Sequence, residues 1–378
     1  MRVRLLKILD ATIGLFLCWA GGWVLYWVRR EASPHELVTA DIRRILVIRP
    51  GGLGDMILVQ PMLEKLHAKY PLASIDLVCE RRNQEIMEFS RSAATVLTYD
   101  SRPFRLIGKL MAGRYDLAID TEQFHYFSAV MALLSRAPFR IGYKINPGRN
   151  PIYTHLISYD LEGYEADEFL KLLRPLGIST SAEVKGCLKL PDVILPDDLE
   201  TVLDEARSGS TGLLLIHVGS SSRYKTWDIS NFAGLVRGLG KDRAIRIGLV
   251  GGRKDSPVAA LVAQRSGLTD RISVMAGRLT LRQTARLLGE ATLFVGGDSG
   301  LAHLAATYGV PSVVLFGPSD FRKWSREGQT SVVVRKEMAC SPCFIFGYHK
   351  YCRSITCMES IGVRDVLDAC RKLMSLGS

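Results

Sequence analysis

The sequence predicts an α/β protein built from two successive doubly wound, Rossmann-like domains. Short apolar runs alternate with amphipathic helical stretches along most of the chain. Each half also has a glycine-rich or small-residue turn after its first apolar run, following Ile45–Ile48 in one half and Gly212–His217 in the other. With 378 residues, the chain is long enough for two domains with full cores.

The charge balance favours an anionic partner. The formal net charge is +11, and a globular composition of 47% hydrophobic and 23% charged residues argues against extensive disorder. A positive surface suits phosphosugars, acidic lipid headgroups or nucleic acid. Because the chain has no RNP-like aromatic run, no Cys/His finger spacing and no basic heptad arm, no nucleic-acid partner is expected.

Residues 1–38 are expected to form a hydrophobic, membrane-associating segment and a linker. Ala11–Val28 contains no charged residue, and basic residues flank it in the sequence: Arg2, Arg4, Lys7, Arg29 and Arg30. As a helix it would be roughly 27 Å long, marginal for a hydrocarbon core of about 30 Å. Its tryptophans fit an interfacial anchor as well as a span. A helix buried against the body is the alternative, and we favour membrane attachment with a cytoplasmic body.

The first domain is predicted over residues 39–196. The strand Ile45–Ile48 leads through glycines to Asp55, which starts a helix. This turn is neither a G-x-G-x-x-G nor a Walker A motif, so nicotinamide or ATP binding is disfavoured. Asp55 is either a simple helix-terminal acid or a chemical group, because open α/β sheets place ligands at the carboxyl ends of strands.

Further polar residues follow other strands of the first domain. Additional strands are predicted at Ser74–Cys79, Val96–Tyr99 and Tyr115–Asp120. Glu122 and Gln123 then either line the acceptor side of a site or cap a loop. Arg140–Tyr143, with Lys144 and Arg149, is expected to be a basic loop that receives an acidic acceptor or lies solvated at the surface.

The second domain is predicted over residues 197–378, after a proline-rich connection. The strand Gly212–His217 leads to Ser220 and Ser221, whose hydroxyls can donate to phosphate oxygens, and to Lys225, which can neutralise them. An ordinary surface lysine is the alternative. Ile245–Val250 is a further strand that ends before Gly251-Gly252-Arg253-Lys254-Asp255.

The segment Ala291–Pro318 predicts a strand, a glycine turn, a helix and a second strand. The helix start has unpaired N–H groups and the positive end of the helix dipole, so it suits a phosphate. The residues expected around this phosphate-binding helix start are Asp298, Ser299, Gly300, Leu301 and His303. Helix capping by Asp298 and Ser299 is the simpler alternative.

Four cysteines near the C-terminus have the spacing C-x2-C-x8-C-x4-C: Cys340, Cys343, Cys352 and Cys357. Zinc takes four thiolates in tetrahedral geometry, so a structural zinc is one interpretation. Reduced thiols in cytoplasm, or a disulfide pair in an oxidising compartment, are the others.

Together these motifs resemble glycosyltransferase family 9, the heptosyltransferases. The family's D-[ST]-G-x-x-H, G-x-P and F-G-P-[ST]-[DN] run is matched between Asp298 and Asp320. Its L-G-D turn is matched by Leu53-Gly54-Asp55, its strand-end histidine by His217, its K-x-W by Lys225 to Trp227, and its G-G-x-x-[DE] turn by Gly251 to Asp255. The usual proline after the tryptophan is Asp228 here.

This resemblance implies a GT-B fold, with two domains facing across a cleft, and an inverting transfer of heptose from ADP-heptose to a lipopolysaccharide inner-core acceptor. Asp55 would be the base, with Gly54 on the acceptor side. Asp255 would contact the ribose, and Asp298 and His303 would bind the diphosphate and the donor sugar. Neither a cofactor nor a catalytic metal is expected.

The resemblance also implies the partners and the location. These are a nucleotide-sugar donor, a lipid-linked glycan acceptor and the cytoplasmic face of the bacterial inner membrane. The alternatives are another nucleotide sugar, a nucleotide-sugar epimerase, or a non-catalytic sugar-nucleotide sensor or scaffold. Product analysis would distinguish an epimerase, because it would turn over the donor without an acceptor.

Overall fold

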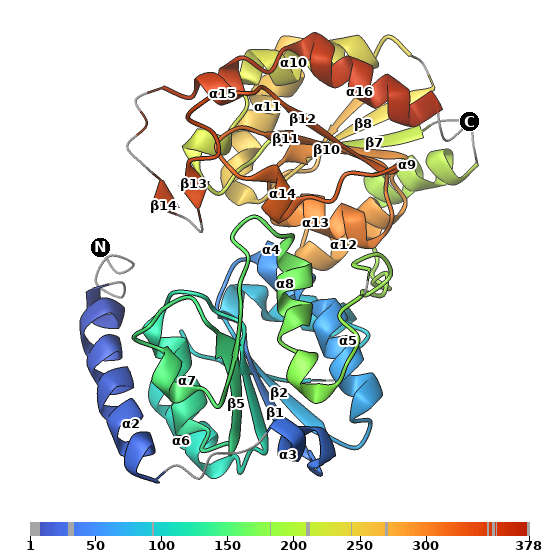
Figure 1. The fold of residues 1–378 in the computed structure, drawn as a ribbon. Coiled ribbons are helices and arrows are strands. Elements are labelled where there is room, and N and C mark those ends of the chain that lie inside the picture. Colours follow the sequence, from blue (N-terminus) through green and yellow to red (C-terminus); the bar gives the residue numbers. More distant parts are fainter. Residues whose placement is uncertain are drawn as a thin grey trace. The chain divides into compact units, whose positions relative to one another are not determined.

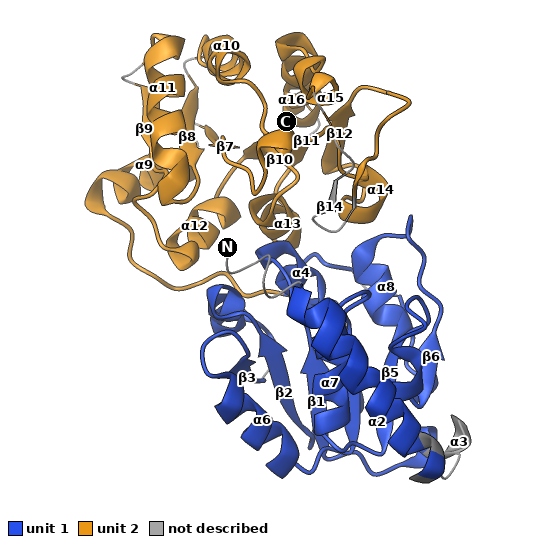
Figure 2. Ribbon diagram, turned by 90° about the vertical axis from the view of Figure 1, so that its left-hand side faces the viewer, with its two compact units in different colours: residues 1–187 blue, residues 188–378 orange. Residues whose placement is uncertain are grey.

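The computed structural model describes residues 8–28, 34–92, 94–181, 183–208, 212–242, 244–268, 271–345, 348–349, 352 and 354–375. Two compact units make up the chain, Met1–Cys187 and Leu188–Ser378 (Figure 2). The division falls before the proline-rich connection, and the N-terminal helical segment is included in unit 1.

Unit 1 contains a six-stranded sheet whose pairings are all parallel, in the order β3-β2-β1-β4-β5-β6. Its strands are β1 (Arg44–Ile48), β2 (Ser74–Cys79), β3 (Thr95–Thr98), β4 (Leu117–Asp120), β5 (Phe139–Tyr143) and β6 (His155–Ile157). Nearly all residues of β1 and β4 are buried, as expected for central strands covered on both faces.

Helices cover both faces of this sheet (Figure 1). α6 and α7 lie on one side, and α5 and α8 lie on the other, while α2 packs on the outside of α7 (Figure 1). The helices of unit 1 are α2 (Leu15–Val28), α3 (Pro34–Thr39), α4 (Leu53–Leu58), α5 (Gln60–Lys69), α6 (Pro103–Ala112), α7 (Tyr126–Leu134) and α8 (Glu165–Lys171). None of the helices in the described ranges is long and apolar enough to cross a membrane.

The prediction of a basic loop over Arg140–Tyr143 is wrong, because these residues belong to strand β5. Arg140 is buried, and its Nε donates to the carbonyl of Ile152 at 2.7 Å. Arg149 is also buried, whereas Lys144 is exposed. The charges misled the prediction, since an arginine in a strand can be buried when its guanidinium donates to carbonyl oxygens, as Arg140 does to Ala137 and Ile152.

Unit 2 repeats the topology of unit 1 with a second parallel sheet, in the order β12-β11-β10-β7-β8-β9. Its strands are β7 (Gly212–His217), β8 (Ile245–Val250), β9 (Ile272–Val274), β10 (Leu293–Gly297), β11 (Ser312–Phe316) and β12 (Ser331–Arg335). In each unit the first strand lies beside the fourth, which is the point where open sheets of this kind bind ligands.

The helices of unit 2 also lie on both sides of its sheet, with α10 and α16 on one side and α12 and α13 on the other (Figure 1). They are α9 (Asp197–Arg207), α10 (Ile229–Leu239), α11 (Ser256–Ser266), α12 (Leu281–Gly289), α13 (Gly300–Thr307), α14 (Phe321–Trp324), α15 (Thr356–Glu359) and α16 (Val363–Ser375). The short strands β13 (Phe344–Ile345) and β14 (Tyr348–His349) pair antiparallel.

Trp227 is part of the unit 2 core. Its side chain is 2% exposed, its ring packs edge-on against Phe232 at 5.0 Å between centroids, and its indole N–H donates to the carbonyl of Ile361 at 2.9 Å. The tryptophan of the K-x-W motif therefore anchors the loop that carries Lys225 to the body of the unit.

Candidate functional site

The turn after β1 positions Asp55 in the first turn of α4. Its Oδ2 accepts a hydrogen bond from the backbone N–H of Gly52 at 2.7 Å, which closes the turn. A Cβ atom at Gly51 would lie 2.9 Å from the same oxygen. The absence of a side chain at Gly51 therefore gives the carboxylate room to fold back over its own turn.

Arg49, which belongs to none of the sequence motifs, is the ion-pair partner of Asp55. Its Nη2 donates to Asp55 Oδ1 at 2.8 Å, and its Nη1 donates to the carbonyl of Thr121 at 2.8 Å. Burial by itself lowers the pKa of Arg49, but the nearby carboxylates, led by Asp55, raise it above its ordinary value. A charged residue at the end of an apolar strand was the available signal, since a buried arginine has to be paired.

The carboxylate of Asp55 is more accessible than the guanidinium that holds it. Its side chain is 17% exposed, against 4% for Arg49. Each carboxylate oxygen already accepts one hydrogen bond, and each has a second lone pair that can accept another from a hydroxyl group. This geometry suits a general base, while the acceptor-side role of the neighbouring Gly54 stays a prediction.

Glu122 and Gln123 lie in the loop after β4, and both are buried. Glu122 Oε1 accepts hydrogen bonds from the backbone N–H groups of Gln123 and Phe124, at 3.0 and 3.1 Å. The Gln123 amide donates to Glu165 Oε1 at 2.6 Å. These contacts are those of residues that shape the loop, and a direct contact with an acceptor stays a prediction.

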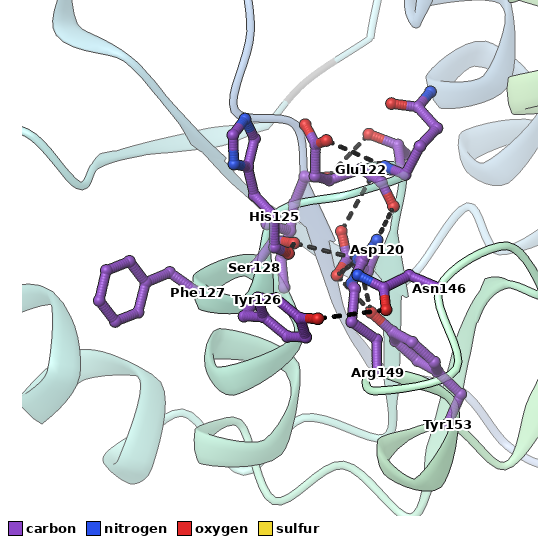
Figure 3. A network of polar contacts seen from close by, with 12 residues as sticks. Asp120, Glu122, His125, Tyr126, Phe127, Ser128, Asn146, Arg149 and Tyr153 are labelled. Atoms are coloured by element: carbon purple, nitrogen blue, oxygen red, sulfur yellow. Dashed lines mark hydrogen bonds and ion pairs between the residues drawn. The ribbon is translucent and has the colours of Figure 1, made fainter. Parts of the chain in front are cut away.

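A buried network supports the same loop from below (Figure 3). Arg149 Nη2 and the Tyr153 hydroxyl both donate to Asp120 Oδ2, each at 2.6 Å, and Arg149 Nη1 donates to the carbonyl of Glu122 at 2.7 Å. Burial by itself lowers the pKa of Arg149, but Tyr153 and Asp120 raise it above its ordinary value. These buried hydrogen bonds and the Arg149–Asp120 ion pair thus fix the position of the loop that follows β4.

In unit 2, the ends of the adjacent strands β7 and β10 bring Lys225 and Asp298 together. Lys225 Nζ donates to Asp298 Oδ2 at 2.7 Å, with both side chains largely buried. Burial alone would raise the pKa of Asp298, but the charges of Lys225 and His303 hold it below its ordinary value. Lys225 is therefore not the exposed surface lysine of the simpler interpretation.

His217 ends β7 and connects two of the predicted residues. Its Nδ1 lies 3.1 Å from Ser299 Oγ, and its Nε2 lies 4.0 Å from Asp255 Oδ2. Burial lowers the pKa of His217 to about 4. The positive charge of Lys254 also lowers this pKa, whereas the negative charge of Asp255 raises it. The imidazole is therefore neutral near pH 7 and can exchange hydrogen bonds without adding charge.

Asp255 is held closely by its surroundings. Its Oδ2 accepts a hydrogen bond from Gly252 N–H at 2.8 Å. A Cβ atom at Gly219 would lie 2.3 Å from Asp255 Cγ, and Gly251 has a φ of +156° beside it. Because glycines on two loops make room for this buried carboxylate, its position is fixed by the backbone. Its predicted contact with a ribose stays a prediction.

The start of α13 has backbone donors without partners. Ser299 is the N-cap residue, but its hydroxyl is turned to His217 instead of capping the helix. In the part of the chain that the structure describes, the N–H groups of Gly300 and Leu301 have no hydrogen-bond acceptor. Two N–H donors at a helix N-terminus beside a lysine form an arrangement that binds phosphate oxygens.

The serine loop before Lys225 divides into two parts. Ser220 Oγ donates to the carbonyl of Ser222 at 3.0 Å and accepts from its N–H at 3.2 Å, so it is used by its own turn. Ser221 is exposed.

His303 of α13 is buried near Trp324, with 6.3 Å between ring centroids. The structure thus gathers Lys225, Asp298 and the α13 start, and places Ser220 in a structural turn.

Residues 103–348 match the model of glycosyltransferase family 9 (heptosyltransferase). The chain belongs to this family. Lipopolysaccharide heptosyltransferase 3 of Escherichia coli is 25% identical over 72% of the chain and 84% of its own length. Lipooligosaccharide heptosyltransferase 2 of Haemophilus ducreyi is 25% identical over 77% of the chain and 88% of its own length.

A solved structure of the E. coli ADP-heptose lps heptosyltransferase II shares the fold, with a TM-score of 0.67 and 21% identity over 88% of this chain and 99% of that one. The two parallel six-stranded sheets therefore form a GT-B fold, as the sequence predicts. This family 9 protein is a glycosyltransferase.

Unit 1 of this glycosyltransferase also contains a basic pocket of about 420 Å³ at the edge of its sheet. Thr98 and Ser101 line it, together with four cationic side chains from the β2 end and α6: Arg81, Arg102, Arg105 and Lys109. Among the described residues, none of these four cations is paired with a carboxylate. Unpaired cations beside hydroxyl groups suit a phosphate or carboxylate. No local sequence pattern marks this pocket, because its cations are spread over two segments.

In the part of the chain that the structure describes, no disulfide joins the four C-terminal cysteines of this family 9 protein, which range from the buried Cys357 to the exposed Cys340. In the described ranges, no three or more His, Cys, Asp or Glu side chains are grouped to hold a metal ion. Burial raises the pKa of the Cys357 thiol. A structural zinc at these cysteines stays a prediction for metal analysis.

Proposed function

We propose that this enzyme transfers a heptose from ADP-heptose to the inner core of lipopolysaccharide, with inversion at the anomeric carbon. The names of its relatives, lipopolysaccharide and ADP-heptose heptosyltransferases, support this donor and acceptor. The observation that supports binding of the nucleotide-sugar donor is the start of α13. There the N–H groups of Gly300 and Leu301, which have no acceptor among the described residues, lie at the same strand ends as Lys225.

In the proposed reaction, Asp55 takes the proton of an acceptor hydroxyl while the oxygen of that hydroxyl forms a bond to the anomeric carbon. The bond from that carbon to the diphosphate breaks, and the departing ADP keeps the electron pair. Lys225 and the two N–H groups of α13 stabilise the charge that develops on the diphosphate. Arg49 holds Asp55 in position. In this proposal no metal or cofactor takes part in the transfer.

Donor recognition is assigned to the remaining predicted residues of unit 2. Asp255 accepts hydrogen bonds from ribose hydroxyls, and a carboxylate suits two neighbouring hydroxyls because it has two acceptor oxygens. Asp298 holds Lys225 and, with His303, borders the donor sugar. Ser221 is exposed in the same loop and donates to the diphosphate.

The acceptor is anionic in this proposal. The basic pocket of unit 1, lined by Arg102 and Arg105 among others, receives a phosphate or carboxylate group of the acceptor. The enzyme works at the cytoplasmic face of the inner membrane, where a lipid-linked acceptor and its donor can meet.

The test is a transfer assay with radiolabelled ADP-heptose and a set of lipopolysaccharides truncated before the first, second and third heptose. Label should enter one of these acceptors with the wild type and stay absent with Asp55→Asn. Asp41→Asn is the matched control, because this exposed carboxylate pairs with Arg43 on the surface and, among the described residues, with no other cation. ADP binding without transfer to any acceptor would overturn the proposed acceptor, and other sugar nucleotides would then be assayed.

A further inference from the structure

The N-terminal helical segment has one face built to pack on the protein. It runs through a π-helical turn, Asp10–Gly14, into α2, which lies along α7 (Figure 1). The contacting face includes glycines that allow a close approach to unit 1. A Cβ atom at Gly21 would lie 2.3 Å from Leu133, and one at Gly22 would lie 2.6 Å from Pro151. Larger residues at these positions would push the helix off unit 1.

Asp10 fixes the beginning of this segment to α7. Its carboxylate accepts hydrogen bonds from the N–H groups of Tyr126 and Phe127, at 3.1 and 2.7 Å, and lies 3.2 Å from His125 Nδ1. Burial would raise the pKa of Asp10, but these hydrogen bonds and His125 hold it below its ordinary value. The carboxylate thus caps the N-terminus of α7, and the segment is a fixed part of unit 1.

The opposite face of the segment is apolar and exposed. No Asp, Glu, Lys or Arg occurs between residues 11 and 28. Trp19, Trp23 and Trp27 are 65%, 60% and 71% exposed, although they are among the largest apolar side chains. They share the outward side of the helix with Ile13, Phe16, Leu17 and Val24. A continuous apolar face of this size marks an interaction surface.

We propose that this face lies in the surface of a lipid bilayer containing anionic lipids, with the helix axis in the plane of the membrane. The tryptophans are suited to the interface between headgroups and hydrocarbon. One side of the helix is held by α7 and Pro151, so only the outward side is available to lipid. This mode of attachment agrees with the finding that no described helix can cross a membrane.

Charge selects the bilayer over a second copy of the chain. The protein has a net charge of +11, and basic residues flank the apolar run on both sides in the sequence. Two such chains repel each other, whereas the cytoplasmic leaflet is negative and attracts basic residues near its surface. Because Asp10 caps the helix that follows the Glu122 loop, attachment would also fix the orientation of that loop to the membrane.

The first experiment measures binding of the full chain to vesicles of phosphatidylethanolamine and phosphatidylglycerol, and to vesicles of phosphatidylcholine alone. The variant is Trp19→Ser, Trp23→Ser and Trp27→Ser combined. We expect anionic vesicles to bind the wild type and the variant to bind roughly tenfold or more weakly. The matched control replaces three exposed apolar residues elsewhere, Leu72, Phe104 and Ile194, by Ser and should bind like the wild type.

Brominated lipids give a second readout that needs no variant. Quenching of wild-type tryptophan fluorescence by bromine near the headgroups is expected, because the three exposed tryptophans would be in contact with lipid. Absence of both binding and quenching would overturn the proposal. So would a wild-type dimer that becomes monomeric in the triple variant, since a second copy would then cover this face.

Activity measurements separate membrane attachment from the proposed function. Attachment itself does not depend on the proposed function, and only its role in reaching the lipid-linked acceptor rests on it. The triple variant should keep wild-type turnover of a delipidated inner-core oligosaccharide and lose turnover of the lipid-linked acceptor in vesicles. If no acceptor is used by either protein, the proposed function fails while the vesicle result still decides the attachment.

Discussion

Two turns of the molecule have the same local structure and different surroundings. Gly51-Gly52-Leu53-Gly54-Asp55 in unit 1 and Gly251-Gly252-Arg253-Lys254-Asp255 in unit 2 share the G-G-x-x-D pattern. In each, the aspartate accepts a hydrogen bond from the second glycine's N–H, at 2.7 and 2.8 Å. Yet Asp55 meets a buried arginine, and Asp255 lies near a histidine that is neutral near pH 7. The turn sets the geometry, and the neighbouring strands set the chemistry.

The largest expected effect is a difference between the two aspartates. Asp55→Asn should lower kcat by about 10²- to 10⁴-fold, because it removes the proposed base. Asp255→Asn should instead raise the KM for the donor about tenfold with a small change in kcat, because it weakens hydrogen bonds to a charged group. Steady-state kinetics of both variants test this. Equal losses of kcat would show that the two turns are functionally alike.

Removing the partner of Asp55 should destabilise unit 1. Arg49→Met leaves a largely buried carboxylate without its cation, and we expect the free energy of unfolding to fall by about 3 kcal/mol. Arg43→Met, at the exposed pair with Asp41, should change it by less than about 1 kcal/mol. Urea unfolding followed by circular dichroism measures both. Similar small changes would mean that Arg49 does not secure the turn.

Unit 2 should lose stability in acid because of His217. Its pKa is about 4 in the folded protein and 6.5 as the ordinary value, so the unfolded chain binds the proton more tightly. The contribution of neutral His217 to the free energy of unfolding is complete above pH 6.5. It decreases as the pH falls toward 4, by about 2–3 kcal/mol at pH 4.5. His217→Gln should remove this pH dependence. Urea unfolding at pH 7.5 and 4.5, followed by circular dichroism, is the measurement. A variant whose free energy of unfolding falls as much as that of the wild type between these pH values would contradict the prediction.

The basic pocket should affect acceptor binding alone. Arg102→Gln combined with Arg105→Gln is expected to raise the KM for a phosphorylated acceptor about five- to tenfold, since each removes a cation beside the anion. The KM for ADP-heptose should stay unchanged. Arg136→Gln is a control in the same unit that leaves the pocket intact. A loss that is equal for phosphorylated and dephosphorylated acceptors would show that the pocket does not bind the anion.

The smallest effect concerns the cysteines near the C-terminus. If Cys340, Cys343, Cys352 and Cys357 hold zinc, elemental analysis should find about one zinc per chain, and chelation should lower the Tm by a few degrees while leaving kcat nearly unchanged. Cys343→Ser should lose the metal, and Cys79→Ser, at a buried cysteine of unit 1, should keep it. If the wild-type protein purified without chelators contains no zinc, the prediction of a zinc site is wrong.

The sequence alone determined the architecture to a large extent. The strands Ser74–Cys79, Gly212–His217 and Ile245–Val250 were predicted at the residues where the structure has them. Apolar runs, glycine turns and helix starts act over a few residues, so their consequences can be read locally. The same holds for Asp55 and for the helix start at Gly300, because each is positioned by its own turn.

Only the tertiary structure decided which groups meet. Arg49 with Asp55, His217 with Ser299, and Asp10 with the start of α7 are partners chosen by strand order and helix packing. The sequence left the apolar N-terminal run open between a span, an interfacial anchor and a buried helix, and the fold shows one face packed and one exposed. Contacts between segments far apart in the chain depend on the arrangement of the whole sheet, and a local pattern has no information about it.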